Sequence, residues 1–209
     1  MKIQGKRVFY MLLGIFLIGV CVAAYRMSGF GVDPFTCMNL GISGFLKMSF
    51  GNWQLIMNIL ILVIVFFTVR HCIGLGTVVN MVFVGYIADF LCWLFQDQLH
   101  IPMGMPLRIV MLGIGMLFAS LGAALYMTAD MGIAPYDSVA FIIMKLTKDK
   151  VSFKAGRVSS DITVMIVGVV FCLLAGHSVW TVVGLGTVMN SLCNGPLIQF
   201  FRNRLEKSR

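Results

Sequence analysis

Long apolar runs without charge are the feature that most constrains this chain. Five runs contain no Asp, Glu, Lys or Arg: 8–25, 53–69, 72–88, 109–129 and 178–201. A sixth run, 158–176, is interrupted only by Asp161. A helix that crosses a bilayer needs about 20 mostly apolar residues, and these runs leave no room for a soluble domain. The sequence therefore predicts an all-α membrane protein with six transmembrane helices.

The basic residues predict how those helices are oriented. If the N-terminus is cytoplasmic, the segments on that side hold 13 of the 16 Lys and Arg residues, and the other side holds Arg26, Lys47 and Arg108. Basic residues accumulate in cytoplasmic loops of membrane proteins. We therefore expect both termini in the cytoplasm and a multi-pass protein of the bacterial inner membrane.

The two halves of the sequence resemble each other. A shift of 101 positions aligns Arg7 with Arg108 and Pro34 with Pro135, and a shift of 110 positions aligns residues 74–80 with 184–190 at six of seven identities. Each half holds three spans, and an odd number makes the halves point in opposite directions. We expect two inverted three-helix repeats, 1–105 and 106–209, in one membrane domain, a plan found in many secondary transporters.

Each repeat contains a break after its first span. Proline suits the first turn of a helix, so a short helix is expected at 34–47 and at 135–148. Both are too short to span, and are either interfacial or re-entrant. If they are re-entrant, two helix N-termini meet near the midplane, where such ends attract anions. The candidate substrate-binding residues are Pro34, Thr36, Asn39, Asn80, Pro135, Asp137 and Asn190.

Three charged residues are candidates for coupling or gating. Charges inside a membrane are costly and often functional. Arg157 and Asp161 are four residues apart on one helix face, and form either a structural clamp or part of a gate. Asp89 either reaches the outer interface or binds a proton. Gln54 and Asn58 occupy similar positions in the first half without charge, so the second half is expected to carry the charged chemistry.

Several other functions find no support in the sequence. The six cysteines contain no Cys-x-x-Cys pair, and no nucleophile and base have informative spacing. We therefore expect no disulfide framework, metal site, catalytic residue, cofactor or enzymatic activity. The charge of +8 sits at helix ends and sets topology, so nucleic acid is not expected as a partner. The expected partners are the lipid bilayer and a small polar or anionic solute. Small-residue faces such as Gly19/Ala23 pack either within the chain or against a second copy in a homodimer.

These motifs are similar to those of a known family. The segment from Gly132 to Asp137, the pair Arg157 and Asp161, and the run from Gly184 to Pro196 resemble the YczE/YitT group of bacterial membrane proteins. The resemblance implies the fold and the bacterial membrane location, and it implies no particular substrate. The first half has Thr36 where the second has Asp137, so the acidic position is not shared.

The sequence favours a small-solute secondary transporter that works by alternating access, with Asp89, Asp137 or Asp161 available for proton coupling. Two alternatives have the right size and span count: a substrate-binding subunit of an energy-coupling-factor importer, and an ion or solute channel. An intramembrane enzyme or a structural partner protein is the remaining class.

Overall fold

The computed structural model of the chain describes residues 2–207, apart from the side chains of residues 2, 3, 154, 191, 192, 195 and 206. The described part is helical and contains no strand. Its elements are α1 (Lys2–Ser28), α2 (Pro34–Leu46), α3 (Phe50–Thr68), η1 (Arg70–Cys72), α4 (Leu75–Cys92), η2 (Trp93–Gln98), α5 (Met105–Ala129), η3 (Tyr136–Ser138), α6 (Val139–Leu146), α7 (Phe153–Leu174), η4 (Val179–Thr181) and α8 (Leu185–Lys207). The all-α prediction is confirmed.

Five helices in the described residues are long and apolar enough to cross a membrane. They comprise Gln4–Ser28, Phe50–Thr68, Leu75–Gln98, Met105–Ala129 and Ala155–Leu174. The chain is therefore a multi-pass membrane protein. The expected sixth span begins later than its apolar run, because residues 179–181 form a 3₁₀ turn and α8 starts at Leu185.

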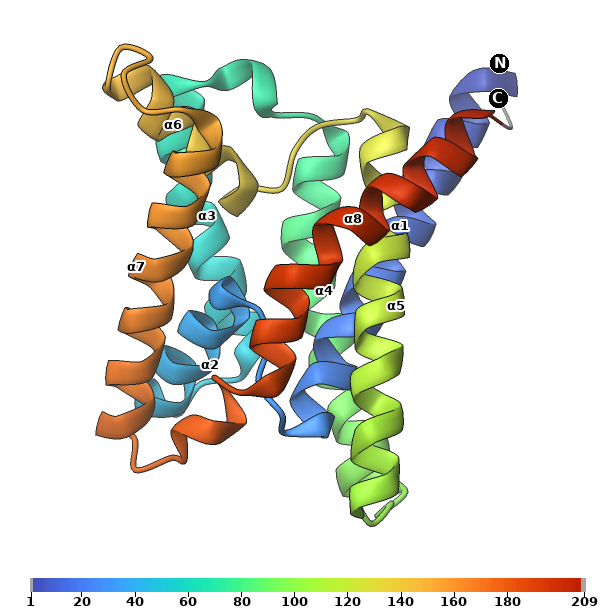
Figure 1. Cartoon of the computed structure of the whole chain (residues 1–209), viewed down its shortest axis with the longest axis vertical. Coiled ribbons are helices and arrows are strands. Elements are labelled where there is room, and N and C mark those ends of the chain that lie inside the picture. The colour runs from blue at the N-terminus through green and yellow to red at the C-terminus, as the bar shows by residue number, and fades with distance from the viewer. Residues whose placement is uncertain (1, 208–209) are drawn as a thin grey trace.

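Helix α1 packs against both α5 and α4, and α1 and α5 lie together at the right of Figure 1. Gly14 and Gly122 let α1 and α5 approach closely, since a Cβ on Gly14 would lie 2.8 Å from the carbonyl oxygen of Gly122. Gly19 lies against Ile87 of α4 in the same way, so one small-residue face packs inside the chain. The first turns of α1 and the last turns of α8 lie at the same end of the molecule (Figure 1).

The loop between α1 and α2 is bound to the start of α8, far away in the sequence. The amide of Gly186 donates to the carbonyl of Phe30 at 2.6 Å. The hydroxyl of Thr187 donates to the carbonyl of Val32 at 2.8 Å, and the amide of Val32 donates to the carbonyl of Val182 at 3.1 Å. The break in the first half is thus held by the second half.

The loop after α5 is bound to the start of α4 by the same three hydrogen bonds. The amide of Gly76 donates to the carbonyl of Met131 at 2.7 Å, and the amide of Ile133 donates to the carbonyl of Cys72 at 2.9 Å. The hydroxyl of Thr77 donates to the carbonyl of Ile133 at 2.8 Å. Every partner matches its counterpart in the α8 set after a shift of 101 positions in the loops or 110 positions at the helix starts.

Two arginines repeat this exchange at the helix C-termini. Arg7 of α1 donates to the carbonyl of Ala129 at the end of α5 at 2.8 Å. Arg108 of α5 donates to the carbonyl of Ser28 at the end of α1 at 2.6 Å. A cation near the C-terminus of a helix satisfies free carbonyls and opposes the helix dipole.

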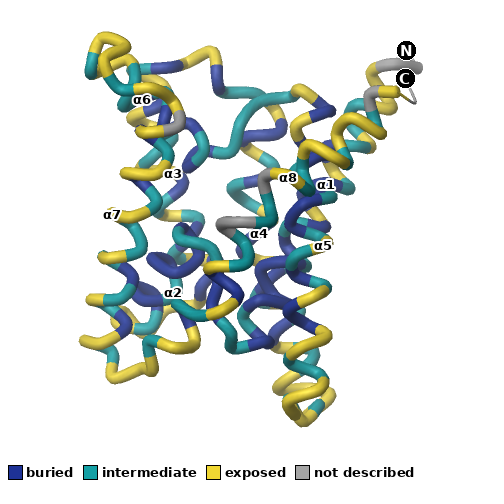
Figure 2. The backbone as a smooth tube through the Cα atoms, viewed as in Figure 1, coloured by how far each residue is buried: buried dark blue, intermediate teal, exposed yellow. Residues whose placement is uncertain are grey.

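The two short helices differ in depth. α2 is buried along most of its length (Figure 2) and packs on α7, where a Cβ on Gly41 would lie 2.3 Å from the carbonyl oxygen of Gly168. The corresponding residues in the other half are Ile142 of α6 and Val65 of α3, which meet in an apolar cluster. Their side chains prevent an equally close approach, so α6 packs less closely on α3 than α2 does on α7. The expected helix 135–148 is a 3₁₀ turn followed by α6, which has eight residues.

Candidate functional site

The two helix breaks meet at a pair of stacked aromatic rings. Phe35, in the first turn of α2, lies parallel to Tyr136 of η3 with a centroid distance of 4.4 Å and an interplanar angle of 13°. Each ring follows a proline, Pro34 or Pro135, that opens its segment. The structure thus brings together the two ends that the sequence singled out as substrate-binding.

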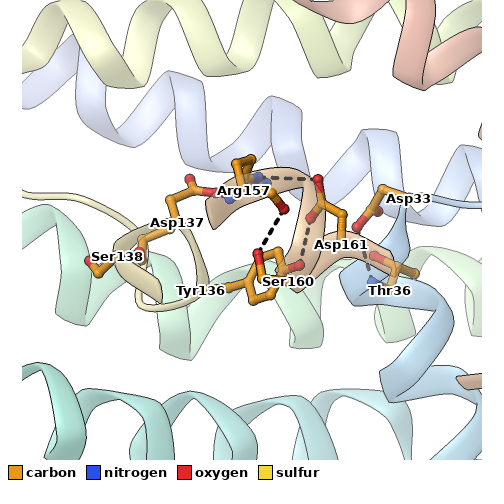
Figure 3. Close-up of polar contacts among 9 residues, drawn as sticks. Asp33, Thr36, Tyr136, Asp137, Ser138, Arg157, Ser160 and Asp161 are labelled. Carbon is orange, nitrogen blue, oxygen red and sulfur yellow. Dashed lines mark hydrogen bonds and ion pairs between the residues drawn. The ribbon is translucent and has the colours of Figure 1, made fainter. Parts of the chain in front are cut away.

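A cluster of charged groups surrounds Tyr136 (Figure 3). Arg157 of α7 donates to Asp137 at 2.6 Å and forms a longer ion pair with Asp161 at 3.4 Å. Its guanidinium lies 4.8 Å from the centre of the Tyr136 ring. The Tyr136 hydroxyl donates to the other oxygen of Asp161 at 2.5 Å. One arginine therefore fixes two carboxylates and one ring, and the predicted pairing of Arg157 with Asp161 is present in the structure.

The cluster is only partly shielded from solvent. The side chains of Arg157, Asp161 and Asp137 are 34%, 28% and 43% exposed. Part of each side chain therefore lies at the surface of the molecule. The ion pairs are weaker than fully buried ones, because solvent screens them.

Asp33 adds a third carboxylate to this region (Figure 3). It precedes Pro34 and caps α2, accepting a hydrogen bond from the amide of Thr36 at 3.0 Å. Burial raises the pKa of the Asp33 carboxyl, and the Thr36 hydrogen bond and the charge of Arg157 oppose that rise. With Asp137 and Asp161, three carboxyl groups lie around one arginine, so the cluster has an acidic excess.

The first half carries an uncharged version of the cluster. The serines that cap α3 and α7, Ser49 and Ser152, align at a shift of 103 positions. The same shift pairs Gln54 with Arg157 and Asn58 with Asp161. Gln54 is 6% exposed and its side-chain oxygen has no hydrogen-bond partner in the described structure.

A second polar site lies at the opposite end of the molecule. Asp89 of α4 pairs with Arg26 of α1 at 2.7 Å and accepts from the amide of Gly51 in α3 at 2.6 Å. The Arg26 guanidinium lies 4.7 Å from the centre of the Phe50 ring. The predicted coupling residue Asp89 is therefore remote from Arg157 and Asp161, and it already has a cationic partner that sequence spacing alone could not identify.

The Arg26–Asp89 pair borders a cavity of about 420 Å³. The polar part of its lining also includes Ser43, Ser49, Gln96, His177 and Thr181. Ligand pockets commonly enclose about 300–1,000 Å³, so the cavity has room for a small solute.

The remaining candidates occupy three different places. Asn39 is fully buried in α2 and donates to the carbonyl of Phe35 at 2.8 Å. Asn190 of α8 accepts from the hydroxyl of Tyr25 at 3.4 Å. Asn80 is buried in α4. The seven predicted substrate-binding residues therefore do not form a single site: the structure gathers Pro34, Thr36, Pro135 and Asp137 near the charged cluster and places Asn80 and Asn190 on other helices.

Sequence reasoning missed Asp33, Tyr136 and Arg26 as site residues. Asp33 could have been recognised from its place directly before Pro34, because an acidic residue before a helix-opening proline is a typical N-cap. Tyr136 is the aromatic neighbour of Asp137, and its alignment with Phe35 marked it as the polar member of the pair. Arg26 had no such signal, since its partner is 63 positions away.

Comparison with known proteins identifies the family. Residues 5–203 match a family of unknown function, DUF6198. An uncharacterized protein of Haemophilus influenzae is 30% identical over 200 residues, which cover 96% of this chain and 85% of that protein. In Bacillus subtilis, the uncharacterized protein YyaS is 23% identical over 93% of this chain and 92% of its own length, and the uncharacterized membrane protein YczE is 22% identical over 88% and 82%.

No solved structure matches the chain. The similarity to YczE agrees with the resemblance drawn from the motifs, and the match covers nearly the whole sequence. The chain belongs to the DUF6198 family.

Proposed function

We propose that the protein is a small-solute secondary transporter built from two inverted three-helix repeats, 1–105 and 106–209, with α8 as the sixth span. The observation that carries this proposal is the crossed binding of the two helix breaks. Each break is held by the start of a helix in the other half. Two hydrogen bonds come from the Gly-Leu-Gly-Thr segment, and a third is accepted by the carbonyl two residues before it. A solute bound between the halves contacts both, so rocking one half against the other exposes it to either side.

Proton coupling is assigned to the charged cluster. Asp161 accepts from Tyr136 and pairs with Arg157 at the long distance of 3.4 Å, whereas Asp137 holds Arg157 at 2.6 Å. Protonation of Asp161 weakens its pairing with Arg157 and leaves the arginine to Asp137. A proton can thus change the contact between α7 and η3, which belong to the region where the two breaks meet.

The electrostatics of the breaks bear on the solute. The N-terminus of α2 is already capped by Asp33, so a free anion has a competitor there. Three carboxyl groups around Arg157 also favour a proton or another cation over an anion. The geometry therefore supports a small polar solute more strongly than an anionic one.

The expected topology places both termini in the cytoplasm of a bacterial cell. The first turns of α1 and the last turns of α8 lie at the same end of the molecule (Figure 1), which supports a shared side for the two termini. In that orientation the charged cluster lies in the cytoplasmic half and the Arg26 cavity opens outward.

The test uses the purified full chain in liposomes that contain a pH-sensitive dye. Defined pools of amino acids, amines, polyols and organic acids are added outside, one pool at a time. The expected result is a pool that changes the internal pH with the wild type, and that does so much less with Asp161→Asn. Asn58→Asp, which adds a carboxyl in the uncharged half, serves as the matched control and does not restore the response in Asp161→Asn.

Three outcomes contradict parts of the proposal. Uptake of a solute that is insensitive to a proton gradient removes the coupling. Unitary currents in a planar bilayer identify a channel, because channel flux far exceeds that of alternating access. Uptake that requires a copurifying ATPase module identifies an importer subunit instead.

A further inference from the structure

One face of α2 is polar although the helix is buried. Thr36, Asn39 and Ser43 are spaced three and four residues apart, which places them on one side of a helix. All three are buried. The apolar residues Phe35 and Ile42 of the same helix belong to a cluster with Tyr136. A buried helix of this kind has no need of polar groups for packing, so the polar face requires another explanation.

The polar face leaves a hydrogen-bond acceptor unused. Asn39 is 0% exposed, its amide nitrogen donates to the carbonyl of Phe35, and its oxygen has no partner in the described structure. Ser43 donates to the carbonyl of Leu40 in the same helix at 3.2 Å. Burying an unpaired amide oxygen costs about 1–3 kcal/mol. A buried polar atom without a partner calls for an explanation, and a ligand that supplies the missing donor would provide one.

The two ends of the polar face open on the two sites already described. Ser43 lines the 420 Å³ cavity beside Arg26 and Asp89. At the other end, the amide of Thr36 binds Asp33, and Asp33 lies within electrostatic range of Arg157 and Asp161. The face therefore lies between the cavity and the charged cluster, and Figure 3 shows its Thr36 end, where Asp33 lies beside Asp161.

We propose that the polar face of α2 is the path of the solute, with Ser43 at the entrance, Asn39 at the constriction and Thr36 at the exit toward the charged cluster. This inference rests on the proposed transport function and adds the route to it. The solute donates a hydrogen bond to the Asn39 oxygen as it passes.

The charges along the path define the chemical class of the solute. Arg26 is paired with Asp89 at the entrance, and Arg157 is paired with Asp137 and Asp161 at the exit. Asp33 adds a further carboxyl beside Thr36. The three side chains between them are neutral amides or hydroxyls. The path therefore suits a small polar solute with hydrogen-bond donors and without net negative charge, such as a polyol, an amide or an amine.

The test measures how fast single thiols react with small charged reagents. Ser43→Cys, Asn39→Cys and Thr36→Cys are made in the full chain and purified in detergent, and the matched control is Ile42→Cys on the apolar face of the same helix. Each is treated with a cationic (trimethylammonium) or an anionic (sulfonate) methanethiosulfonate, and modification at each site is read by peptide mass spectrometry. Rates are normalised to those of free cysteine.

The proposal expects Ser43→Cys and Asn39→Cys to react several times faster than Ile42→Cys, and Thr36→Cys to react faster with the cationic reagent. If Ser43→Cys and Asn39→Cys react no faster than Ile42→Cys, the path is overturned. If the anionic reagent is faster at Thr36→Cys, the charge class is overturned.

The wild-type chain offers a readout that depends on no substitution. Cys92 and Cys172 line the cavity, whereas Cys21 and Cys72 are buried to a similar extent elsewhere. The two cavity thiols are expected to react faster than the other two. Equal rates for all four would contradict the claim that the cavity is the entrance of the path. If the thiols along α2 react but the protein transports none of the tested solutes, the transporter proposal is refuted and the accessible path along α2 stands. Transport by a protein whose α2 thiols do not react refutes the path alone.

Discussion

The two halves of the molecule place similar residues in different environments. Around Arg157, the polar groups are charged, paired with one another and partly exposed. Around Gln54, at the corresponding position of the first half, they are neutral and buried. The crossed hydrogen bonds at the breaks are nearly identical in the two halves, so the shared scaffold does not cause this difference.

The packing of the long helices differs at these two positions. Gln54 of α3 is buried against α4, where a Cβ on Gly85 would lie only 2.6 Å from the Gln54 side-chain oxygen. Arg157 of α7 binds Asp137 of η3, and its side chain is 34% exposed. We therefore expect burial to determine whether the polar groups of each half are charged or neutral, and substitutions that change the charge at these positions test this.

A charge introduced into the uncharged half is expected to have the largest effect. In Gln54→Arg, the larger side chain enters a crowded and buried site, because the Gln54 oxygen lies only 2.6 Å from the position that a Cβ on Gly85 would take. An uncompensated buried charge costs about 3–5 kcal/mol. Thermal unfolding in detergent should show a large loss of stability or no folded protein.

The matched control is Gln54→Met, which has a similar shape and no charge, and it should unfold near the wild-type temperature. If Gln54→Arg is as stable as Gln54→Met, burial does not explain why this half is neutral.

Removing the arginine of the charged half should have a smaller effect. Arg157→Gln leaves Asp137 and Asp161 without their cation, and because the pairs are partly exposed the expected loss is about 2 kcal/mol, less than for a fully buried pair. The triple variant Arg157→Gln, Asp161→Asn, Asp137→Thr copies the first half at these three positions and leaves Asp33 as the remaining carboxyl of the cluster. It should be more stable than Arg157→Gln alone in the same unfolding measurement. A triple variant that is less stable than the single one would mean that the ion pairs stabilise the fold beyond mutual neutralisation.

The crossed breaks should respond equally in the two halves. Thr77→Val and Thr187→Val each remove a hydroxyl that bonds to a loop carbonyl of the other half at 2.8 Å, at a cost of about 1–2 kcal/mol. Gly113→Ala in α5 is the control, because a Cβ there meets nothing within 4 Å. A cost at one threonine that is several times the cost at the other would show that the two breaks are not equivalent.

Much of the architecture could be predicted from the sequence, but the degree to which each helix is buried could not. Apolar runs and prolines predicted the long helices and the start of α2 because these signals are local. The break of the expected helix 135–148 into η3 and α6, and the late start of α8, depend on contacts with distant segments. Arg26 and Asp89 are a pair of this kind, since neither residue has its partner nearby in the sequence.

The candidate site was predicted in part for the same reason. Arg157 and Asp161 are one helical turn apart, so their pairing follows from local spacing. Their union with Tyr136 and Asp33 requires the two breaks to meet, which only the folded structure reveals. The different burial of Thr36 and Asp137, which align in the repeat, depends on glycines elsewhere in the chain.

The smallest effect is expected at Asp137, an acidic residue that aligns with Thr36 of the first half. Asp137→Thr places the first-half residue in the second half and removes the 2.6 Å contact with Arg157, while Asp161 remains as a partner. Because the Asp137 side chain is 43% exposed, the loss of stability should be only about 0.5–1 kcal/mol. Thr36→Asp is the reciprocal change, and it should cost more, since Thr36 is buried and its amide already binds the Asp33 carboxyl. Unfolding of both variants, alone and combined, measures the asymmetry directly. Equal costs for the two substitutions would show that the difference in burial between Thr36 and Asp137 does not determine which of the two positions tolerates a charge.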